Sequence, residues 1–164
     1  MIHIITTGGT IEGLDYENQE NKTEQSEIAI REFLDLANVS FPYIIERAFS
    51  KDSRSITDED RNFLLKKIKA SNAEKILITH GTFTMEDTAI YLGKEEIKKT
   101  IVLVGSFIMG NSKNTDAHFN LGFAMCSAQF LNPGVYVAMN GTIFPWNDVT
   151  KNIEVSKFEY KNEQ

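Results

Sequence analysis

Two glycine-rich segments carry hydroxyl side chains in an arrangement that could attack a carbonyl carbon. Residues 7–13 read TGGTIEG, and residues 80–84 read HGTFT. Paired glycines let the backbone approach a ligand closely and leave amide N–H groups to stabilise a developing oxyanion. The Thr10 hydroxyl beside them would be a poor nucleophile at its free pKa, so it needs a proton acceptor nearby.

Each segment taken alone also has a simpler structural interpretation. A Gly-Gly-Thr turn is more often an ordinary tight turn, Thr82 fits a helix N-cap, and Ser53 in residues 51–54 fits a turn. His80 is expected to be a hydrogen-bonded structural histidine rather than a metal ligand or a base. A phosphate-binding loop is disfavoured because neither GxxxxGK[ST] nor GxGxxG occurs.

Apolar runs predict the strands that would position these segments. The runs are bounded by glycine or polar clusters, as buried strands are, and cover residues 2–6, 43–49, 75–79, 100–104 and 134–139. Residues 7–13, 51–54, 80–84 and 105–106 directly follow four of them. Ligands bind at the carboxyl ends of the strands in open parallel sheets, so we expect these loops to form one site.

The intervals between the predicted strands show helical periodicity. Residues 28–37 form one apolar face, and Phe63, Leu64 and Ile68 form another after a Thr57-x-x-Asp60 start that resembles a capping box. Residues 85–92 and 117–131 supply two more helices. The alternation predicts an α/β fold with three layers, in which helices cover both faces of a flavodoxin-like, open and mostly parallel sheet. Residues 141–160 break this rhythm and predict a C-terminal extended arm or hairpin.

Composition restricts the partners and the compartment. The chain has 164 residues and a formal net charge of -6, with a pI near 5.1, which disfavours binding to nucleic acid or anionic lipid. No run approaches the roughly 18 apolar residues of a membrane span, and the N-terminus lacks the charged start of a signal peptide. The one cysteine, Cys126, lies in an apolar run and is expected in the core. No zinc-ligand spacing occurs, and we expect a cytoplasmic protein without a metal site.

The order and spacing of the motifs resemble the L-asparaginase family. Residues 7–11 look like the first threonine signature of that family, residues 80–89 look like the second, and residues 104–106, 116–121 and 148–152 give further matches. The resemblance implies that residues 1–164 form a single asparaginase-type N-terminal domain. It also implies an amino-acid-metabolising hydrolase that cleaves a small side-chain amide, L-asparagine or a related one, to a carboxylate and ammonia, with no cofactor.

The resemblance assigns expected roles to individual residues. Thr10 would be the nucleophile that forms an acyl-enzyme, and Tyr16 is a candidate for activating it. Thr82 and Lys151 would transfer protons, and Ser53 would hold the substrate carboxylate. The other expected substrate-binding residues are Gly9, Asp52, Arg54, Gly81, Phe83 and Ser106.

Two features depart from the family pattern. Phe83 stands where the family has an aspartate that receives the substrate α-ammonium group, and a cation–π contact replaces little of that charge-assisted hydrogen bond. Candidates for a substitute carboxylate are Glu12, Asp52, Glu86 and Asp116. Classical members also carry a C-terminal domain that contributes to the active site of a neighbouring subunit. Since this chain ends before such a domain, we expect a homo-oligomer in which another copy completes the site.

Three hypotheses follow for the function. The preferred one is an asparaginase-like amidohydrolase acting on a small-molecule amide. Phe83 supports an alternative amidohydrolase whose substrate lacks a free α-amino group. A noncatalytic amino-acid-binding module is the alternative from another class, because a fold can persist after activity is lost.

Overall fold

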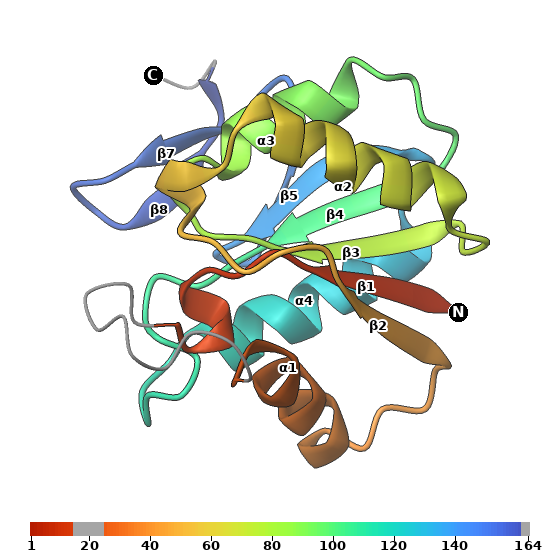
Figure 1. Cartoon of the computed structure of the whole chain (residues 1–164). Helices are drawn as coiled ribbons and strands as arrows, with labels where there is room; N and C mark the ends of the chain where they lie inside the picture. The colour runs from red at the N-terminus through yellow and green to blue at the C-terminus, as the bar shows by residue number, and fades with distance from the viewer. Residues whose placement is uncertain (15–24, 162–164) are drawn as a thin grey trace.

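A six-stranded sheet, parallel except for its last strand, forms the centre of the molecule (Figure 1). The computed structural model describes residues 1–14 and 25–161, with the side chains of residues 25–29 left out. The strand order is β2-β1-β3-β4-β5-β6, which contains the flavodoxin-like order 2-1-3-4-5 expected from the sequence. The strands are β1 (Ile2–Thr6), β2 (Tyr43–Arg47), β3 (Lys75–Thr79), β4 (Thr100–Val104), β5 (Gly134–Met139) and β6 (Thr142–Pro145).

The five parallel strands arise where the apolar runs predict them. Every residue of β1 and β4 is buried, as a sheet covered on both faces requires. The prediction for residues 43–49 was too long, because β2 ends at Arg47. Arg47 pairs with Thr6, the last residue of β1, and the ladder ends where the Ala48 N–H donates to the Thr6 carbonyl at 2.9 Å.

Four helices cover the two faces of the sheet. Helices α2 and α3 lie above it and α1 and α4 below it in the view of Figure 1, which confirms the three-layer prediction. The predicted capping box starts α2, because Thr57 N–H donates to Asp60 Oδ2 at 2.9 Å and Asp60 N–H donates to Thr57 Oγ1. The helices are α1 (Gln25–Leu36), α2 (Asp58–Ala70), α3 (Met85–Gly93) and α4 (Ala117–Phe130).

The C-terminal segment adds two hairpins. Strands β7 (Thr150–Asn152) and β8 (Lys157–Glu159) pair antiparallel, which confirms the predicted hairpin. Strand β6 was not predicted, although Asn140 and Gly141 supply its signal: both have positive φ, 54° and 75°, and an Asn-Gly pair favours the tight turn that joins antiparallel strands.

The prediction for Cys126 was wrong, because this thiol is exposed. Helix α4 carries a second apolar stripe on its outer side, where Phe119, Cys126 and Phe130 recur at roughly helical spacing. An apolar run within a helix must place some of its members on the side away from the core. None of the helices in the described part of the chain is long and apolar enough to span a membrane.

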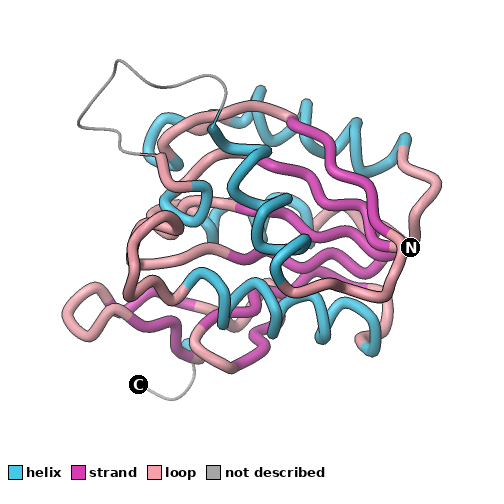
Figure 2. Tube along the Cα trace, turned by 90° about the horizontal axis from the view of Figure 1, so that it is seen from below, coloured by secondary structure: helices cyan, strands magenta, loops and turns pink. Residues whose placement is uncertain are grey.

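The carboxyl ends of the parallel strands all point to one edge of the molecule. Seen from below, the strands run side by side, and several loops gather at the edge away from the N-terminus (Figure 2). A short 3-10 helix, η1 (Thr10–Glu12), lies at the same edge, as does the β7–β8 hairpin (Figure 1). The fold therefore brings the candidate loops to one place.

Candidate active site

The loops after β1, β2 and β3 touch one another through glycine. A Cβ atom added to Gly9 would lie 2.6 Å from the backbone nitrogen of Gly81, and one added to Gly81 would lie 2.7 Å from Ser53 Oγ. Gly9 also has a φ of +93°, which side-chain-bearing residues rarely adopt. These positions need glycine because the three loops approach one another too closely for a side chain.

A cavity of about 360 Å³ opens where these loops meet, a size that suits a small organic ligand. It brings together most of the residues that the sequence indicates, and adds two that it does not. The lining residues are Gly9, Thr10, Leu14, Asp52, Ser53, Arg54, Gly81, Thr82, Phe83 and Met109.

A lysine contacts the second threonine of this cavity. Lys151 Nζ lies 2.9 Å from Thr82 Oγ1 and donates a hydrogen bond to it. The alternative role of Thr82 as a helix N-cap is wrong, since Thr84 stands at the N-cap of α3. The Thr82 hydroxyl therefore bonds a basic group rather than helix amides.

Helix α3 and two aromatic rings hold Lys151 in place. Its backbone N–H donates to Glu86 Oε2 at 3.1 Å, which fixes β7 to the start of α3. The Lys151 ammonium lies 4.1 Å from the ring centre of Phe83 and 5.3 Å from that of Phe107. Burial lowers the pKa of Lys151, because a partly dehydrated site disfavours the charged form. The lysine is thus easier to deprotonate than an exposed one.

A buried carboxylate supports the first loop from behind. Glu12 Oε1 accepts the Gly8 N–H at 2.8 Å and the Thr79 hydroxyl at 2.5 Å. From the other side, the Gly110 N–H donates to the carbonyl of Thr10 at 2.9 Å. These bonds join the loop after β1 to β3 and to the segment after β4, so the backbone around Thr10 is held at several points.

His80 has the structural role that the sequence indicates. Its ring is buried, with Nδ1 2.8 Å from the Gly81 carbonyl and Nε2 2.9 Å from Thr88 Oγ1. The Arg61 Nε–H donates to the same Thr88 hydroxyl at 3.1 Å, so that hydroxyl has its proton available for Nε2. Burial lowers the His80 pKa to about 4, and the nearby Arg61 cation acts in the same direction. A neutral ring therefore fixes the Gly81 carbonyl.

Arg54 and Asp52 form an ion pair at the cavity. The Asp52 carboxylate accepts the Arg54 backbone N–H at 2.9 Å and bonds from Nε and Nη2 of its guanidinium. The guanidinium carbon also lies 4.9 Å from the ring centre of Phe83. Asp52 thus orients Arg54 against the phenyl ring.

Some predicted residues are not brought into the cavity. Ser106 is buried, and its hydroxyl donates to the Ile108 carbonyl at 2.7 Å, so it shapes the loop after β4 instead of lining the cavity. Tyr16 lies outside the described residues. Within the described ranges, no group of three or more His, Cys, Asp or Glu side chains could hold a metal ion.

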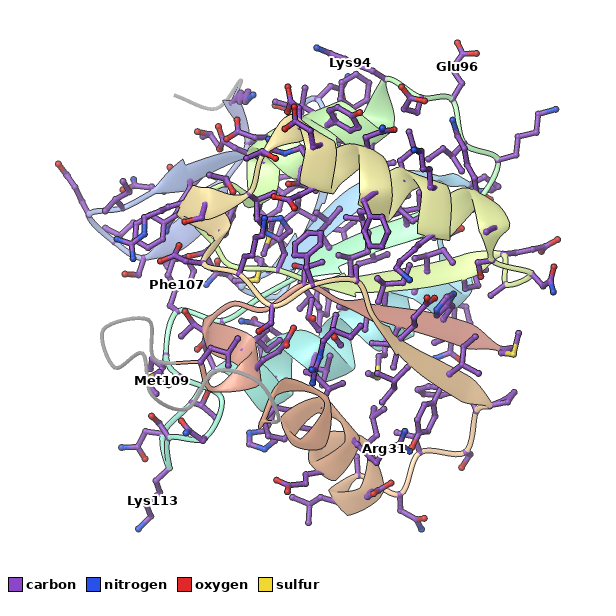
Figure 3. All side chains as sticks on the ribbon, viewed as in Figure 1. Arg31, Lys94, Glu96, Phe107, Met109 and Lys113 are labelled. Atoms are coloured by element: carbon purple, nitrogen blue, oxygen red, sulfur yellow. The ribbon has the colours of Figure 1, made fainter. Side chains whose placement is uncertain are left out.

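The residues that sequence reasoning missed are mainly apolar. Leu14 and Met109 line the cavity, and Phe107 flanks Lys151. Phe107 and Met109 lie on the side of the molecule where the strands end (Figure 3). Their signal was weak, because single apolar residues in loops are common and carry no spacing pattern. Only the positions of Leu14 beyond β1 and of Phe107 and Met109 beyond β4 could have indicated them.

Comparison with known proteins gives consistent matches over the whole chain. The family model "Asparaginase, N-terminal" matches residues 1–160. The chain is 34% identical to a glutaminase-asparaginase of Acinetobacter glutaminasificans, over 93% of this chain and 50% of that protein. It is also 34% identical to L-asparaginase 2 of Escherichia coli, over 98% of this chain and 49% of that protein.

A solved structure gives the same result for the fold. The probable cytoplasmic L-asparaginase of Campylobacter jejuni superposes with a TM-score of 0.79 at 31% identity, over 97% of this chain and 51% of that one. The chain spans about half the length of the curated relatives it matches.

Proposed function

The chain belongs to the asparaginase family, and from this membership and the site geometry we propose that it is an amidohydrolase with a threonine nucleophile. Its substrate is a small molecule with a side-chain carboxamide, which it converts to a carboxylate and ammonia. Residues 1–164 act as one asparaginase-type N-terminal domain.

The reaction proceeds in two balanced steps. Thr10 Oγ attacks the amide carbon, the C–N bond breaks, and ammonia leaves with the proton that the hydroxyl gave up. Water then attacks the resulting ester on Thr10, which releases the carboxylate and restores the hydroxyl. Backbone N–H groups around Gly9 and Thr10, with the Thr82 hydroxyl, stabilise the oxyanion in each step. Lys151, when neutral, accepts and returns the proton through Thr82.

One observation carries this proposal: the 2.9 Å contact between Lys151 Nζ and Thr82 Oγ1, at a cavity that Thr10 also lines. A hydroxyl nucleophile needs a proton acceptor within hydrogen-bond reach. The noncatalytic binding module needs no such pair. Lys151 and Thr82 come from segments that are 69 positions apart in the chain.

The test is ammonia release from a panel of small carboxamides by the wild type and two threonine variants. We expect Thr10→Val to abolish turnover, because valine keeps the branched shape and removes the hydroxyl. Thr142→Val, on β6 and outside the cavity lining, should keep wild-type turnover. Turnover that survives in Thr10→Val would remove Thr10 as the nucleophile, and no turnover on any amide would favour the binding module.

We also propose self-association and a cytoplasmic location. Exposed apolar side chains lie at or beside the site edge, including Phe83, Ile108 and Ile153, and a second copy would cover them. The similarity to a probable cytoplasmic enzyme supports the compartment, although a probable periplasmic L-asparaginase of Haemophilus influenzae is also similar. Light scattering after size exclusion tests self-association, and cell fractionation tests the cytoplasmic location.

A further inference from the structure

Phe83 lines the cavity with an exposed ring that lies close to two basic side chains. It lines the cavity and remains 54% exposed. The Lys151 ammonium lies 4.1 Å from the ring centre, and the Arg54 guanidinium carbon lies 4.9 Å from it. Both cations are attracted to the negative face of the ring. This part of the site thus combines apolar surface with positive charge.

Carboxylates near the cavity are already hydrogen-bonded to other groups. Among the described lining residues, only Asp52 carries a carboxylate, and it bonds the guanidinium and backbone of Arg54. Glu12 accepts from the first loop and from β3. Glu86 accepts the Lys151 backbone N–H.

Asp116, the fourth candidate for a substitute carboxylate, lies in the loop after β4. It accepts the backbone N–H groups of Phe107 and Ile108 at 3.0 and 2.9 Å, as well as the Asn120 side-chain amide. It is also absent from the cavity lining. Each of the four candidates would therefore have to break an existing hydrogen bond before its carboxylate could bind a ligand beside Phe83.

We infer that the substrate is the ω-amide of a dicarboxylic acid that keeps its carboxylate and carries no ammonium group, as in succinamate. This inference rests on the proposed amidohydrolase function and names its substrate class. An ammonium group beside Phe83 would lie close to the Arg54 guanidinium and would lose water without gaining a carboxylate that is not already hydrogen-bonded to another group. A carboxylate is attracted by the Arg54 guanidinium and can accept an N–H of Lys151 in either protonation state of that amine, and methylene groups can lie against the phenyl ring.

The deciding experiment compares matched ligand pairs that differ only in the α-ammonium group. Ammonia release is measured with succinamate and with L-asparagine, and product binding is measured calorimetrically with succinate and with L-aspartate. We expect succinamate to have a kcat/KM at least ~10-fold above that of L-asparagine, and succinate to bind at least ~10-fold more tightly than L-aspartate. L-Aspartate binding that equals or exceeds succinate binding, or no binding of either, would overturn the inference.

The binding measurements distinguish a failure of the amidohydrolase function from a failure of the inferred ligand class. If no amide is hydrolysed but succinate still binds more tightly than L-aspartate, the amidohydrolase function fails and the ligand class stands. If L-asparagine is hydrolysed faster than succinamate, the function stands and the ligand class fails.

Two substitutions at Phe83 test whether this residue causes the selection. Phe83→Asp should shift the succinate-to-aspartate affinity ratio toward aspartate by ~10-fold or more, because it supplies a carboxylate at that position. Phe83→Leu keeps an apolar side chain and should keep the wild-type ratio. An unchanged ratio in Phe83→Asp, with circular dichroism like that of the wild type, would contradict the role of Phe83. If that variant does not fold, the wild-type ratio still decides the ligand class.

Discussion

The Thr82–Lys151 pair shows how one hydrogen bond gives a common residue a specific chemical environment. Threonine at the end of a strand is ordinary, but here its hydroxyl accepts from a half-buried lysine at 2.9 Å. The two phenyl rings beside Lys151 attract its charged form, while burial lowers its pKa.

Replacing this lysine should affect the rate more than binding. We expect Lys151→Met to lower kcat by roughly 10²- to 10⁴-fold, which is typical for loss of a proton-transfer group. Lys157→Met, on β8 of the same hairpin and exposed, is the matched control and should leave kcat unchanged. Steady-state ammonia release over a pH series measures both.

The same series tests the lowered pKa of Lys151. The neutral lysine is the proton acceptor, so kcat should rise with pH toward a plateau, with its midpoint below the ordinary lysine pKa of about 10.4. A rate that falls as pH rises through this range would mean that the charged form is required.

Glu12 is the residue whose removal should loosen the first loop. Glu12→Leu leaves the buried Gly8 N–H and Thr79 hydroxyl without the acceptor they have now, at a cost of about 1–3 kcal/mol for such a lost partner. Glu12→Gln keeps an oxygen acceptor and should cost less. Urea unfolding of both variants gives the comparison, and equal losses would argue against a role for these hydrogen bonds.

At the scale of elements, the site depends on how closely the strand-end loops can pack. We expect Gly9→Ala to lower both stability and activity, because the new methyl group would lie 2.6 Å from the Gly81 backbone and the φ of +93° strains any side chain. Gly122→Ala is the opposite case, since nothing lies within 4 Å of the added atom on α4. It should stabilise the fold by about 0.5–1 kcal/mol through helix propensity.

Thermal unfolding measures the stability of the Gly9→Ala and Gly122→Ala variants, and ammonia release measures their activity. The two alanine substitutions should shift the melting temperature in opposite directions, and only Gly9→Ala should lose activity. A Gly9→Ala variant with wild-type stability would show that the loops can separate at little cost.

At the scale of the whole molecule, buried histidines make stability depend on pH. The pKa of His80 is 6.5 when unperturbed and about 4 in the folded protein, so between these values the unfolded chain binds a proton that the folded one does not. Stability from this group is therefore present above pH 6.5 and is lost as pH falls toward 4, by roughly 3 kcal/mol in total. Burial also lowers the pKa of His3, although the attraction of Glu46 opposes this shift. His3 therefore also reduces stability as the pH falls.

Denaturant unfolding at pH 7 and pH 4.5 checks this dependence. His80→Gln should be less stable than the wild type at pH 7 and should lose less stability on acidification. His118→Gln, at an exposed position on α4, is the control and should follow the wild type. A His80→Gln variant with the full wild-type acid loss would assign that loss to other groups.

The sequence alone determined most of the strands and which loops form the site. Apolar runs give β1, β3, β4 and β5 with the bounds observed, because a strand buried on both faces needs a continuous apolar segment. The capping box at Thr57 and Asp60 is a contact between near neighbours, so its spacing is visible in the sequence. Strand alternation then places the loops after β1, β2 and β3 at one edge.

The tertiary structure decided which side chains meet within that edge. The Lys151–Thr82 contact and the contacts of Phe83 with two basic side chains join segments far apart in the chain, and no local pattern encodes such distances. Periodicity likewise could not tell that Cys126 would face outward, since the rotation of α4 is set by what it packs against. Local propensity and hydrophobic spacing act over a few residues, whereas the charge and shape of the site come from packing between distant ones.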